Sequence, residues 1–222
     1  VAGAPEAAQG GMTRAAGLDA GLAALGLDLP ADARRRLLAY LGLLAKWNQT
    51  YNLTAIRDEN EMLTHHLLDS LAVLPVLEKS ALAGRRWADV GSGAGLPGIP
   101  LAIACPELKL TLVDTVDKKT AFQRQAKIEL GLGNVEVAGG RVEDLPGGGF
   151  DAAISRAFAD LADFIRLAGH LLAAGGILYA MKGLVPEEEI GRLPQVWRLS
   201  ECLPLRVPGV DAQRHLLVLE KA

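Results

Sequence analysis

The sequence predicts an α/β fold, in which a mostly parallel sheet carries helices on both faces and follows a helical N-terminal extension. Three observations predict it. From Arg85 onward, short β-type runs alternate with helical patterns, which is typical of a parallel sheet covered on both faces. The last two β-type runs flank the turn Pro208-Gly209, as in an antiparallel hairpin. Before Arg85, apolar residues recur only with helical spacing.

The length and composition limit the classes of protein to consider. The 222 residues suffice for one α/β domain with a modest appendage, and half of them are hydrophobic. No apolar run reaches the roughly 18–20 residues of a membrane span, so we expect no membrane segment. The net charge of -3 argues against a protein that coats DNA non-specifically. Cys105 and Cys202 lack the spacing of a zinc site, so we expect no metal, reduced thiols and a cytoplasmic location.

The chain divides into three expected parts. Residues 1–17 are small and polar, lack the regions of a signal peptide and are expected to form a flexible tail. Residues 18–84 form the helical extension, with apolar stripes over residues 30–47 and 59–74. Residues 85–222 form the sheet domain. Its expected strands and helices are strands 87–90, 108–113, 135–138, 152–154 and 177–181, helices 99–104, 118–130 and 161–172, and a hairpin of 196–207 with 215–219.

A glycine-rich loop follows the first expected strand directly and reads Asp89-Val90-Gly91-Ser92-Gly93-Ala94-Gly95-Leu96-Pro97-Gly98. Glycine adopts backbone angles that other residues avoid, and it lets the main chain approach a ligand without a Cβ in the way. The loop also begins a helix, whose free N–H groups can meet an anionic ligand group. We therefore predict that this loop, including Gly91 and Gly93, binds a cofactor.

Two cofactors compete for the loop. The spacing Gly93-x-Gly95-x-x-Gly98 matches the dinucleotide fingerprint, so NAD must be considered. S-adenosylmethionine is favoured because Asp89 can hold the loop and the cofactor's amino group, and because Asp114 at the next strand end can accept both ribose hydroxyls. Asp114 alone would serve NAD equally well. The sheet with its last hairpin is the methyltransferase variant of the Rossmann plan, which favours the same cofactor.

The segment after the third strand, residues 140–146, is where methyltransferase folds clamp adenine. The backbone N–H of Val142 can face a ring nitrogen, and the carboxylate of Glu143 can accept from the exocyclic amine. An acidic surface turn before Pro146 is the alternative explanation.

The sequence resembles the bacterial 16S ribosomal RNA guanine-N7 methyltransferase family, historically called glucose-inhibited division protein B. The resemblance runs from about Leu37 to the C-terminus and leaves residues 1 to about 30 outside. His65 stands where related sequences often have arginine. The motifs are Lys46-Trp47-Asn48, Tyr51-Asn52-Leu53-Thr54, His66-x-x-Asp69-Ser70, the glycine loop continued to Ile99-Pro100, Ile154-Ser155-Arg156-Ala157-Phe158, Lys182-Gly183 and Arg214-His215-Leu216.

The resemblance implies an S-adenosylmethionine-dependent enzyme that methylates N7 of a guanosine in 16S ribosomal RNA, as free RNA or in a small-subunit particle. It implies cofactor contacts at Gly91, Leu96, Val142, Glu143 and Arg156. For RNA contact the candidates are Lys182, Arg214 and His215, although each could be an ordinary solvated charge. Arg156 could instead be a surface arginine that caps the helix beginning near Asp160. We expect a monomer.

The chemistry of the residues agrees with this activity by exclusion. Enzymes that methylate an exocyclic amine commonly carry an Asn/Asp-Pro-Pro-aromatic loop after the fourth strand, where this chain has Ser155-Arg156-Ala157-Phe158. Methylation of C5 of a pyrimidine needs a nucleophilic cysteine, and neither cysteine follows a central strand. Guanine N7 carries a lone pair and no proton, so we expect no general base and catalysis mainly by positioning. An NAD-dependent oxidoreductase, which would need a second nucleotide-binding half, and a non-enzymatic RNA-binding module remain the alternatives.

Overall fold

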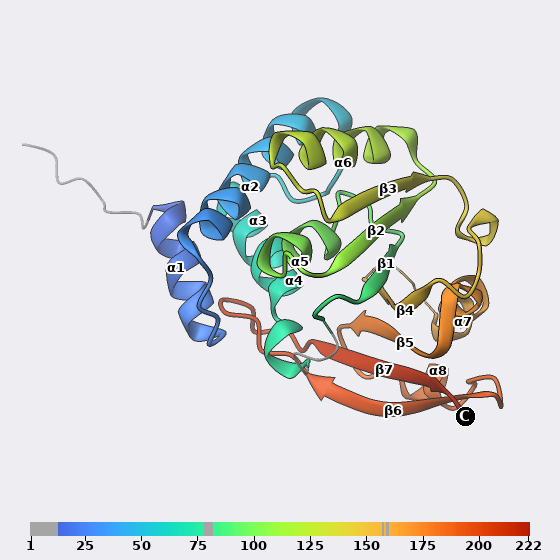
Figure 1. The fold of residues 1–222 in the computed structure, drawn as a ribbon. Helices are drawn as coiled ribbons and strands as arrows, with labels where there is room; N and C mark the ends of the chain where they lie inside the picture. Colours follow the sequence, from blue (N-terminus) through green and yellow to red (C-terminus); the bar gives the residue numbers. More distant parts are fainter. Residues whose placement is uncertain (1–12, 78–81, 157, 159) are drawn as a thin grey trace, which may run out of the picture.

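The computed structural model describes residues 13–77, 82–156, 158 and 160–222, and its centre is a seven-stranded sheet of order β3-β2-β1-β4-β5-β7-β6 (Figure 1). Strands β1 to β5 pair in parallel, and β7 pairs antiparallel with both β5 and β6. The expected parallel sheet with a C-terminal antiparallel pair is therefore confirmed. The strands are β1 (Arg86–Val90), β2 (Lys109–Asp114), β3 (Val135–Gly139), β4 (Phe150–Ser155), β5 (Leu172–Lys182), β6 (Trp197–Pro204) and β7 (His215–Lys221).

Helices or helical turns lie in the connections between successive strands from β1 to β6, and helices make up the extension. In the sheet domain they are α5 (Gly98–Ala104), α6 (Asp117–Glu129), the 3-10 turn η4 (Val142–Asp144), α7 (Leu161–Ala168), the 3-10 turn η5 (Gly169–Leu171) and α8 (Glu187–Ile190). In the extension they are α1 (Arg14–Ala24), α2 (Ala31–Tyr51), α3 (Glu59–Met62), the π-helical turn η1 (Leu63–Leu68), α4 (Asp69–Leu71) and the 3-10 turn η2 (Leu74–Val76). None of the helices in the described ranges is long and apolar enough to cross a membrane.

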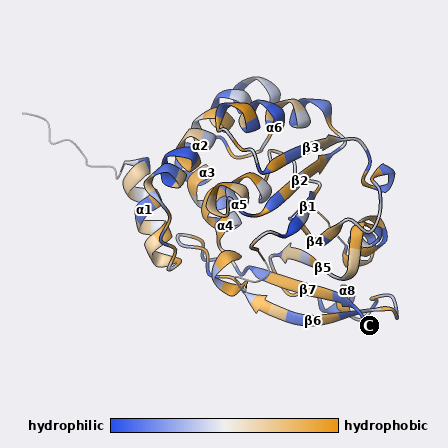
Figure 2. Ribbon diagram, viewed as in Figure 1, coloured by the Kyte–Doolittle hydropathy of each residue, from blue (hydrophilic) through white to orange (hydrophobic). Residues whose placement is uncertain are grey.

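Alternate residues of the central strands point to the two faces of the sheet, and each face is buried. On one face, Tyr179 and Met181 of β5 join a core that also contains α1, α2, α5 and α6. On the other face, Leu178 and Ala180 join a second core with α7. The burial of both faces explains why β5 and β7 are predominantly hydrophobic along their length (Figure 2).

The extension begins earlier than the sequence predicts. Thr13 caps α1 by accepting a hydrogen bond from the N–H of Ala16, so residues 14–17 belong to a helix and not to a flexible tail. Residues 1–12 lie outside the described residues. Leu18 and Leu22 of α1 are buried in the same core as the sheet residue Trp87, so the extension shares its core with the sheet domain.

One boundary in the sheet domain is also corrected. A single helix over residues 161–172 is predicted, but α7 ends at Ala168, a 3-10 turn follows, and Leu172 already belongs to β5. Leu172 pairs with Phe150 of β4 before the register shifts between Phe150 and Ala152. Strand pairing, which the apolar run Leu171-Leu172 does not reveal, decides where the helix ends.

Candidate functional site

The glycine loop lies where the sequence predicts it, at the carboxyl ends of the parallel strands, where ligands gather in open α/β sheets. Gly91, Gly93 and Gly95 have φ values of +71°, +58° and +80°, which L side chains rarely adopt. The N–H groups of Gly91 and Ser92 both donate to the carbonyl of Val113, at 2.9 and 3.0 Å. The loop is therefore fixed across the end of β2.

Asp89 ties the far end of the loop to β1. Its Oδ2 accepts a hydrogen bond of 2.8 Å from the N–H of Gly98, the first residue of α5. A Cβ on Gly98 would lie 2.4 Å from Leu112 Cδ2 and 2.7 Å from this carboxylate oxygen, so glycine is needed there. Burial raises the pKa of Asp89 to about 7. Its Oδ1 is buried and has no hydrogen-bond partner among the described residues.

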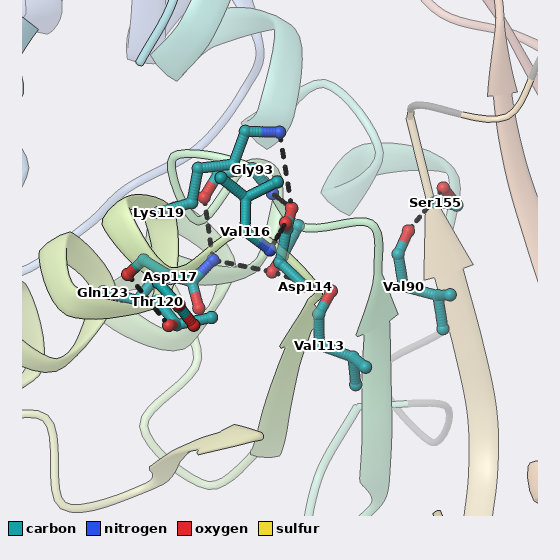
Figure 3. Close-up of polar contacts among 11 residues, drawn as sticks. Val90, Gly93, Val113, Asp114, Val116, Asp117, Lys119, Thr120, Gln123 and Ser155 are labelled. Atoms are coloured by element: carbon teal, nitrogen blue, oxygen red, sulfur yellow. Dashed lines mark hydrogen bonds and ion pairs between the residues drawn. The ribbon is translucent and has the colours of Figure 1, made fainter. Parts of the chain in front are cut away.

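Asp114 at the end of β2 holds the loop from the other side (Figure 3). Its Oδ2 accepts from the N–H of Gly93 at 2.8 Å, and its Oδ1 accepts from the N–H of Val116 at 2.9 Å. Lys119 Nζ lies 3.6 Å from Oδ2. A carboxylate has about four lone-pair sites, so these bonds leave capacity for ribose hydroxyls, and that contact stays a prediction.

Two further side chains that brace the loop were missed from the sequence. The hydroxyl of Tyr40 in α2 donates to the carbonyl of Ala94 at 2.7 Å, although 54 residues separate them. Gln123 Nε2 in α6 donates to Ser92 Oγ and to the carbonyl of Gly93, both at 2.8 Å. Tyr40 lies on the apolar stripe of its helix, between Leu37 and Leu44. A buried tyrosine hydroxyl usually has a hydrogen-bond partner, and this was the sequence signal for its contact with the loop.

A cavity of about 250 Å³, the loop cavity, opens beside the glycine loop. The nearest atom to a Cβ built on Gly93 is the carbonyl of Gly91 at 3.9 Å, so this part of the loop faces open space. Four of the predicted cofactor residues line the cavity, namely Gly91, Gly93, Leu96 and Arg156. The complete lining is Leu53, Thr54, His66, Gly91, Ser92, Gly93, Ala94, Leu96, Lys119 and Arg156.

Arg156, the residue after β4, is joined to the extension. Its Nη1 donates to Asp69 Oδ2 and to the carbonyl of His65, both at 3.0 Å. The second oxygen of Asp69, Oδ1, accepts from Arg214 Nε at 3.1 Å. One buried carboxylate therefore holds two guanidinium groups whose side chains are 25% and 29% exposed. Arg156 does not cap the helix near Asp160; Asp160 itself accepts from the N–H groups of Ala162 and Asp163.

This cluster borders a second cavity of about 360 Å³, which we call the rim cavity. His66 and Arg156 line both cavities and form the wall between them. The rim cavity is bounded by the extension on one side and by the end of β5 and the β6–β7 connection on the other. Its lining is Ile56, His65, His66, Asp69, Arg156, Met181, Lys182, Gly183, Leu205 and Arg214.

His66 contributes a neutral polar group to this wall. Its Nε2 lies 2.8 Å from the hydroxyl of Thr54. Burial, followed by the positive charge of Arg156, lowers the pKa of His66 to about 4, so the ring is uncharged near neutral pH. His65, His66 and Asp69 are not arranged as metal ligands, and no other group of three or more His, Cys, Asp or Glu side chains in the described part of the chain is.

The predicted adenine clamp lies in the 3-10 turn η4 and outside the lining of the loop cavity. Val142 begins this turn, where the first N–H groups have no acceptor within the helix. Glu143 Oε1 accepts from Arg141 Nη2 at 2.7 Å, and this bond lowers the pKa of the carboxyl. Contact of either residue with a cofactor stays a prediction.

The three predicted RNA residues have different surroundings. Lys182 Nζ donates to the carbonyl of Phe158 and to Glu189 Oε2 at 2.9 Å, and its side chain is only 12% exposed. An RNA phosphate would therefore have to displace Glu189, which also accepts from the N–H of Leu161 at the start of α7. His215 Nδ1 lies 2.7 Å from the carbonyl of Gly183. Arg214 borders the rim cavity, pairs with Asp69 through Nε and donates from Nη1 to the carbonyl of Gln213 at 2.9 Å.

These features together fit a bound nucleoside-type cofactor. The glycine main chain faces open space at Gly93, the buried Oδ1 of Asp89 has no hydrogen-bond partner in the described part of the chain, and a carboxylate ends β2. Such a group would be held by Gly91, Gly93, Leu96 and Arg156, which line the cavity, and by Asp114, which binds the N–H of Gly93.

Comparison with solved structures supports the fold. The chain is similar to a SAM-dependent methyltransferase from Aquifex aeolicus, with a TM-score of 0.56 and 20% identity over 73% of this chain and 93% of that one. It is also similar to a SAM-dependent methyltransferase from Thiobacillus denitrificans in complex with S-adenosyl-L-homocysteine, with a TM-score of 0.53 and 16% identity over 69% and 91% of the two chains. At identities this low, the structural similarity establishes the fold and does not establish the activity.

Comparison with sequences identifies the family. The chain is 57% identical to the Ribosomal RNA small subunit methyltransferase G of Azoarcus sp. (strain BH72), over 90% of this chain and 93% of that protein. It is 54% identical to the protein of the same name from Neisseria meningitidis serogroup C, over 95% and 100% of the two. These pairwise matches extend into the first 30 residues, but the family match begins at residue 33, which agrees with the expected resemblance from about Leu37 onward. The family model described as rRNA small subunit methyltransferase G matches residues 33–217, and the chain belongs to this family.

Proposed function

We propose that this protein transfers a methyl group from S-adenosylmethionine to N7 of a guanosine in the RNA of the small ribosomal subunit. The observation that carries the proposal is the loop cavity at the carboxyl edge of the sheet, bounded by the glycine loop and by Arg156. The names of the relatives, ribosomal RNA small subunit methyltransferases, support the class of substrate. We propose further that the enzyme acts in the cytoplasm as a monomer.

Each group at the site has a role in the reaction. The backbone of Gly91 and Gly93 binds the cofactor closely, and Asp114 and Asp89 keep the loop in place. S-adenosylmethionine supplies, when bound, a methyl group on a positively charged sulfur. Arg156 and His66 face this region from the wall between the two cavities. His66 stays neutral, so it adds no repulsion to a cationic cofactor.

The chemistry needs no proton transfer. The lone pair of guanine N7 forms the new bond to the methyl carbon, and the bond from that carbon to sulfur breaks with its electron pair left on sulfur. The positive charge thereby moves from sulfur to the guanine ring. Because no proton leaves, the protein contributes positioning, which in oriented reactions is worth up to about 7–11 kcal/mol.

A methyl-transfer assay tests the proposal. The protein is incubated with tritiated S-adenosylmethionine and 16S RNA transcribed in vitro, either free or assembled with small-subunit proteins. We expect label in 7-methylguanosine after digestion. The control is RNA transcribed with 7-deazaguanosine, which has carbon in place of N7 and should take up no label. Label in the control, or none in the natural RNA, would contradict the proposal.

A binding experiment separates the alternatives. Calorimetric titration with S-adenosylmethionine and NAD in parallel should show binding of the first only. The sheet order argues in the same direction, because β7 lies antiparallel beside β5, where a dinucleotide-binding fold would place its sixth parallel strand. Binding of S-adenosylmethionine without any methyl transfer would favour a non-enzymatic RNA-binding module.

A further inference from the structure

We propose that the rim cavity receives the acceptor guanine, and that Arg156 and Arg214, both held by Asp69, select guanine through its O6 atom. This inference rests on the proposed function and adds the site and the recognition chemistry of the base. Its starting point is the position of the rim cavity, which shares the wall of His66 and Arg156 with the loop cavity. An acceptor in the rim cavity would lie next to a methyl donor in the loop cavity.

The size and walls of the cavity suit a base taken out of an RNA stack. Its volume of about 360 Å³ is within the usual range of small-ligand pockets. Ile56, Met181 and Leu205 supply apolar surface, which a planar ring can contact. Arginine adds a flat guanidinium that stacks or hydrogen-bonds. The cavity therefore combines apolar walls with a few oriented donors.

The hydrogen-bond donors that remain on the two arginines are fixed in place. Arg156 uses Nη1 for both of its bonds, to Asp69 and to the carbonyl of His65. Arg214 uses Nε for Asp69 and Nη1 for the carbonyl of Gln213. A guanidinium has five N–H donors, so each side chain keeps donors for a ligand. Because Asp69 is 4% exposed, its hold on both groups is shielded from water.

These donors distinguish guanine from adenine. On the edge that carries N7, guanine presents the acceptor O6, whereas adenine presents the N6 amino donor at the same place. N7 must stay free for the methyl group, so O6 is the atom left for a guanidinium. An adenine there would set its amino hydrogens against arginine donors and leave both without acceptors. Such a mismatch of buried polar groups commonly rejects the wrong ligand strongly.

The loop that carries Ile56 is rigid enough to form one wall. Asn48 Oδ1 in α2 accepts from the N–H of Thr54, and Asn48 Nδ2 donates to the carbonyl of Ile56 at 3.0 Å. The opposite wall at Gly183 has room for a side chain, because the nearest atoms to a Cβ there are Gln213 O at 3.8 Å and Arg214 Nη1 at 4.0 Å. Residues at both walls can therefore be enlarged independently.

Two variants fill the rim cavity from opposite walls, Ile56→Trp and Gly183→Val. Each should lower kcat/KM for RNA methylation at least tenfold and leave the Kd for S-adenosylmethionine within twofold of wild type. Ile128→Trp is the matched control for bulk, since Ile128 in α6 is 74% exposed. To test the role of the arginine charge, Arg214→Ala is compared with Arg206→Ala, a control on the same β6–β7 connection. The first should lower kcat/KM and the second should not. Thermal unfolding identifies any variant that fails to fold, and the other wall then supplies the test.

A second readout does not depend on activity. The protein is saturated with S-adenosylhomocysteine to occupy the loop cavity, and saturation-transfer NMR is recorded with guanosine 5′-monophosphate and adenosine 5′-monophosphate. We expect a stronger signal from the guanine nucleotide, and loss of that preference in Ile56→Trp and Arg214→Ala.

Three results would overturn the inference. The first is equal binding of the two nucleotides, the second is wild-type methylation in both filled-cavity variants, and the third is a parallel loss of cofactor affinity, which would assign the rim cavity to the cofactor. Failure of the wild-type protein to methylate any RNA would instead refute the proposed function, and guanine-selective binding could still be measured.

Discussion

At the residue scale, substitution of Asp114 is the most direct test of the predicted cofactor site. It accepts from the N–H of Gly93, and we predict that it also accepts from the ribose hydroxyls of the cofactor. Asp114→Ala should weaken S-adenosylmethionine binding by about 1–3 kcal/mol, the cost of leaving buried donors unpaired. Asp114→Asn, which keeps an acceptor, should lose less. Calorimetric titration measures both, with the exposed Asp117→Ala as control. Unchanged affinity in Asp114→Ala would remove this residue from the cofactor site.

Asp89 and His66 predict how stability depends on pH. Burial raises the pKa of Asp89 from 3.8 to about 7, so between these values the unfolded state alone is ionised, and stability falls as pH rises. The pKa of His66 is lowered from 6.5 to about 4, so the unfolded state alone is protonated in that range, and stability rises with pH. The two effects oppose each other between about pH 4 and 6.5.

Removing one of these two groups should reveal the pH dependence of stability that the other contributes. Relative to wild type, the unfolding free energy of Asp89→Asn should rise with pH, and that of His66→Gln should fall, each by up to about 1.4 kcal/mol per pH unit. Urea unfolding at pH 4.5, 5.5 and 6.5 measures these slopes. Parallel pH profiles for all three proteins would show that these groups titrate at their ordinary pKa values.

At the scale of elements, substitutions in the glycine loop should distinguish effects on cofactor binding from effects on folding. Gly93→Ala and Gly95→Ala both place alanine at positive φ, which costs about 1–2 kcal/mol. The new Cβ at Gly93 faces open space, whereas that at Gly95 would lie 2.3 Å from Ile99 Cδ1. Gly93→Ala should therefore stay folded and bind S-adenosylmethionine at least tenfold more weakly, and Gly95→Ala should lose more stability. Urea unfolding and calorimetry report the two effects, and equal stability losses would contradict this reading.

Helix α2 should stabilise the loop through Tyr40. In Tyr40→Phe the buried carbonyl of Ala94 loses its donor, so the unfolding free energy should fall by about 1–3 kcal/mol. Cofactor affinity should fall as well, because the loop is then less fixed. Tyr51→Phe is the matched control, since Tyr51 lies at the end of the same helix and is 43% exposed. A loss no greater in Tyr40→Phe than in the control would mean that α2 does not support the loop.

At the scale of the whole molecule, the extension and the sheet should unfold together. Leu18 in α1 belongs to the same buried core as Trp87 in β1. Leu18→Ala should therefore lower the free energy of global unfolding by about 2–5 kcal/mol, as a cavity in a shared core does. Tryptophan fluorescence and far-ultraviolet circular dichroism should shift to the same lower midpoint. An early loss of helix signal with an unchanged fluorescence midpoint would mean that α1 unfolds on its own.

Features that depend on local pattern could be predicted from the amino-acid sequence. The alternation of strands and helices, the antiparallel end and the glycine loop between Asp89 and Gly98 are all found where they are predicted. These features rest on periodicity and on the backbone freedom of glycine, which act over a few residues. The predicted tail end at residue 17 and the predicted helix end at Leu172 are wrong, because the helix cap at Thr13 and the pairing of Leu172 with Phe150 decide these boundaries.

Which distant residues share a site becomes visible in the folded chain. Asp69 meets Arg156 and Arg214, which lie 87 and 145 residues away along the chain. Lys182, a candidate RNA contact in the sequence analysis, is bound to Glu189 inside the protein. A charged side chain carries no local mark of its partner, because a salt bridge depends on atoms within 4 Å in space and not on spacing in sequence. The cofactor loop can be predicted from the sequence, whereas the wall that Arg156 and His66 form beside it arises when the chain folds.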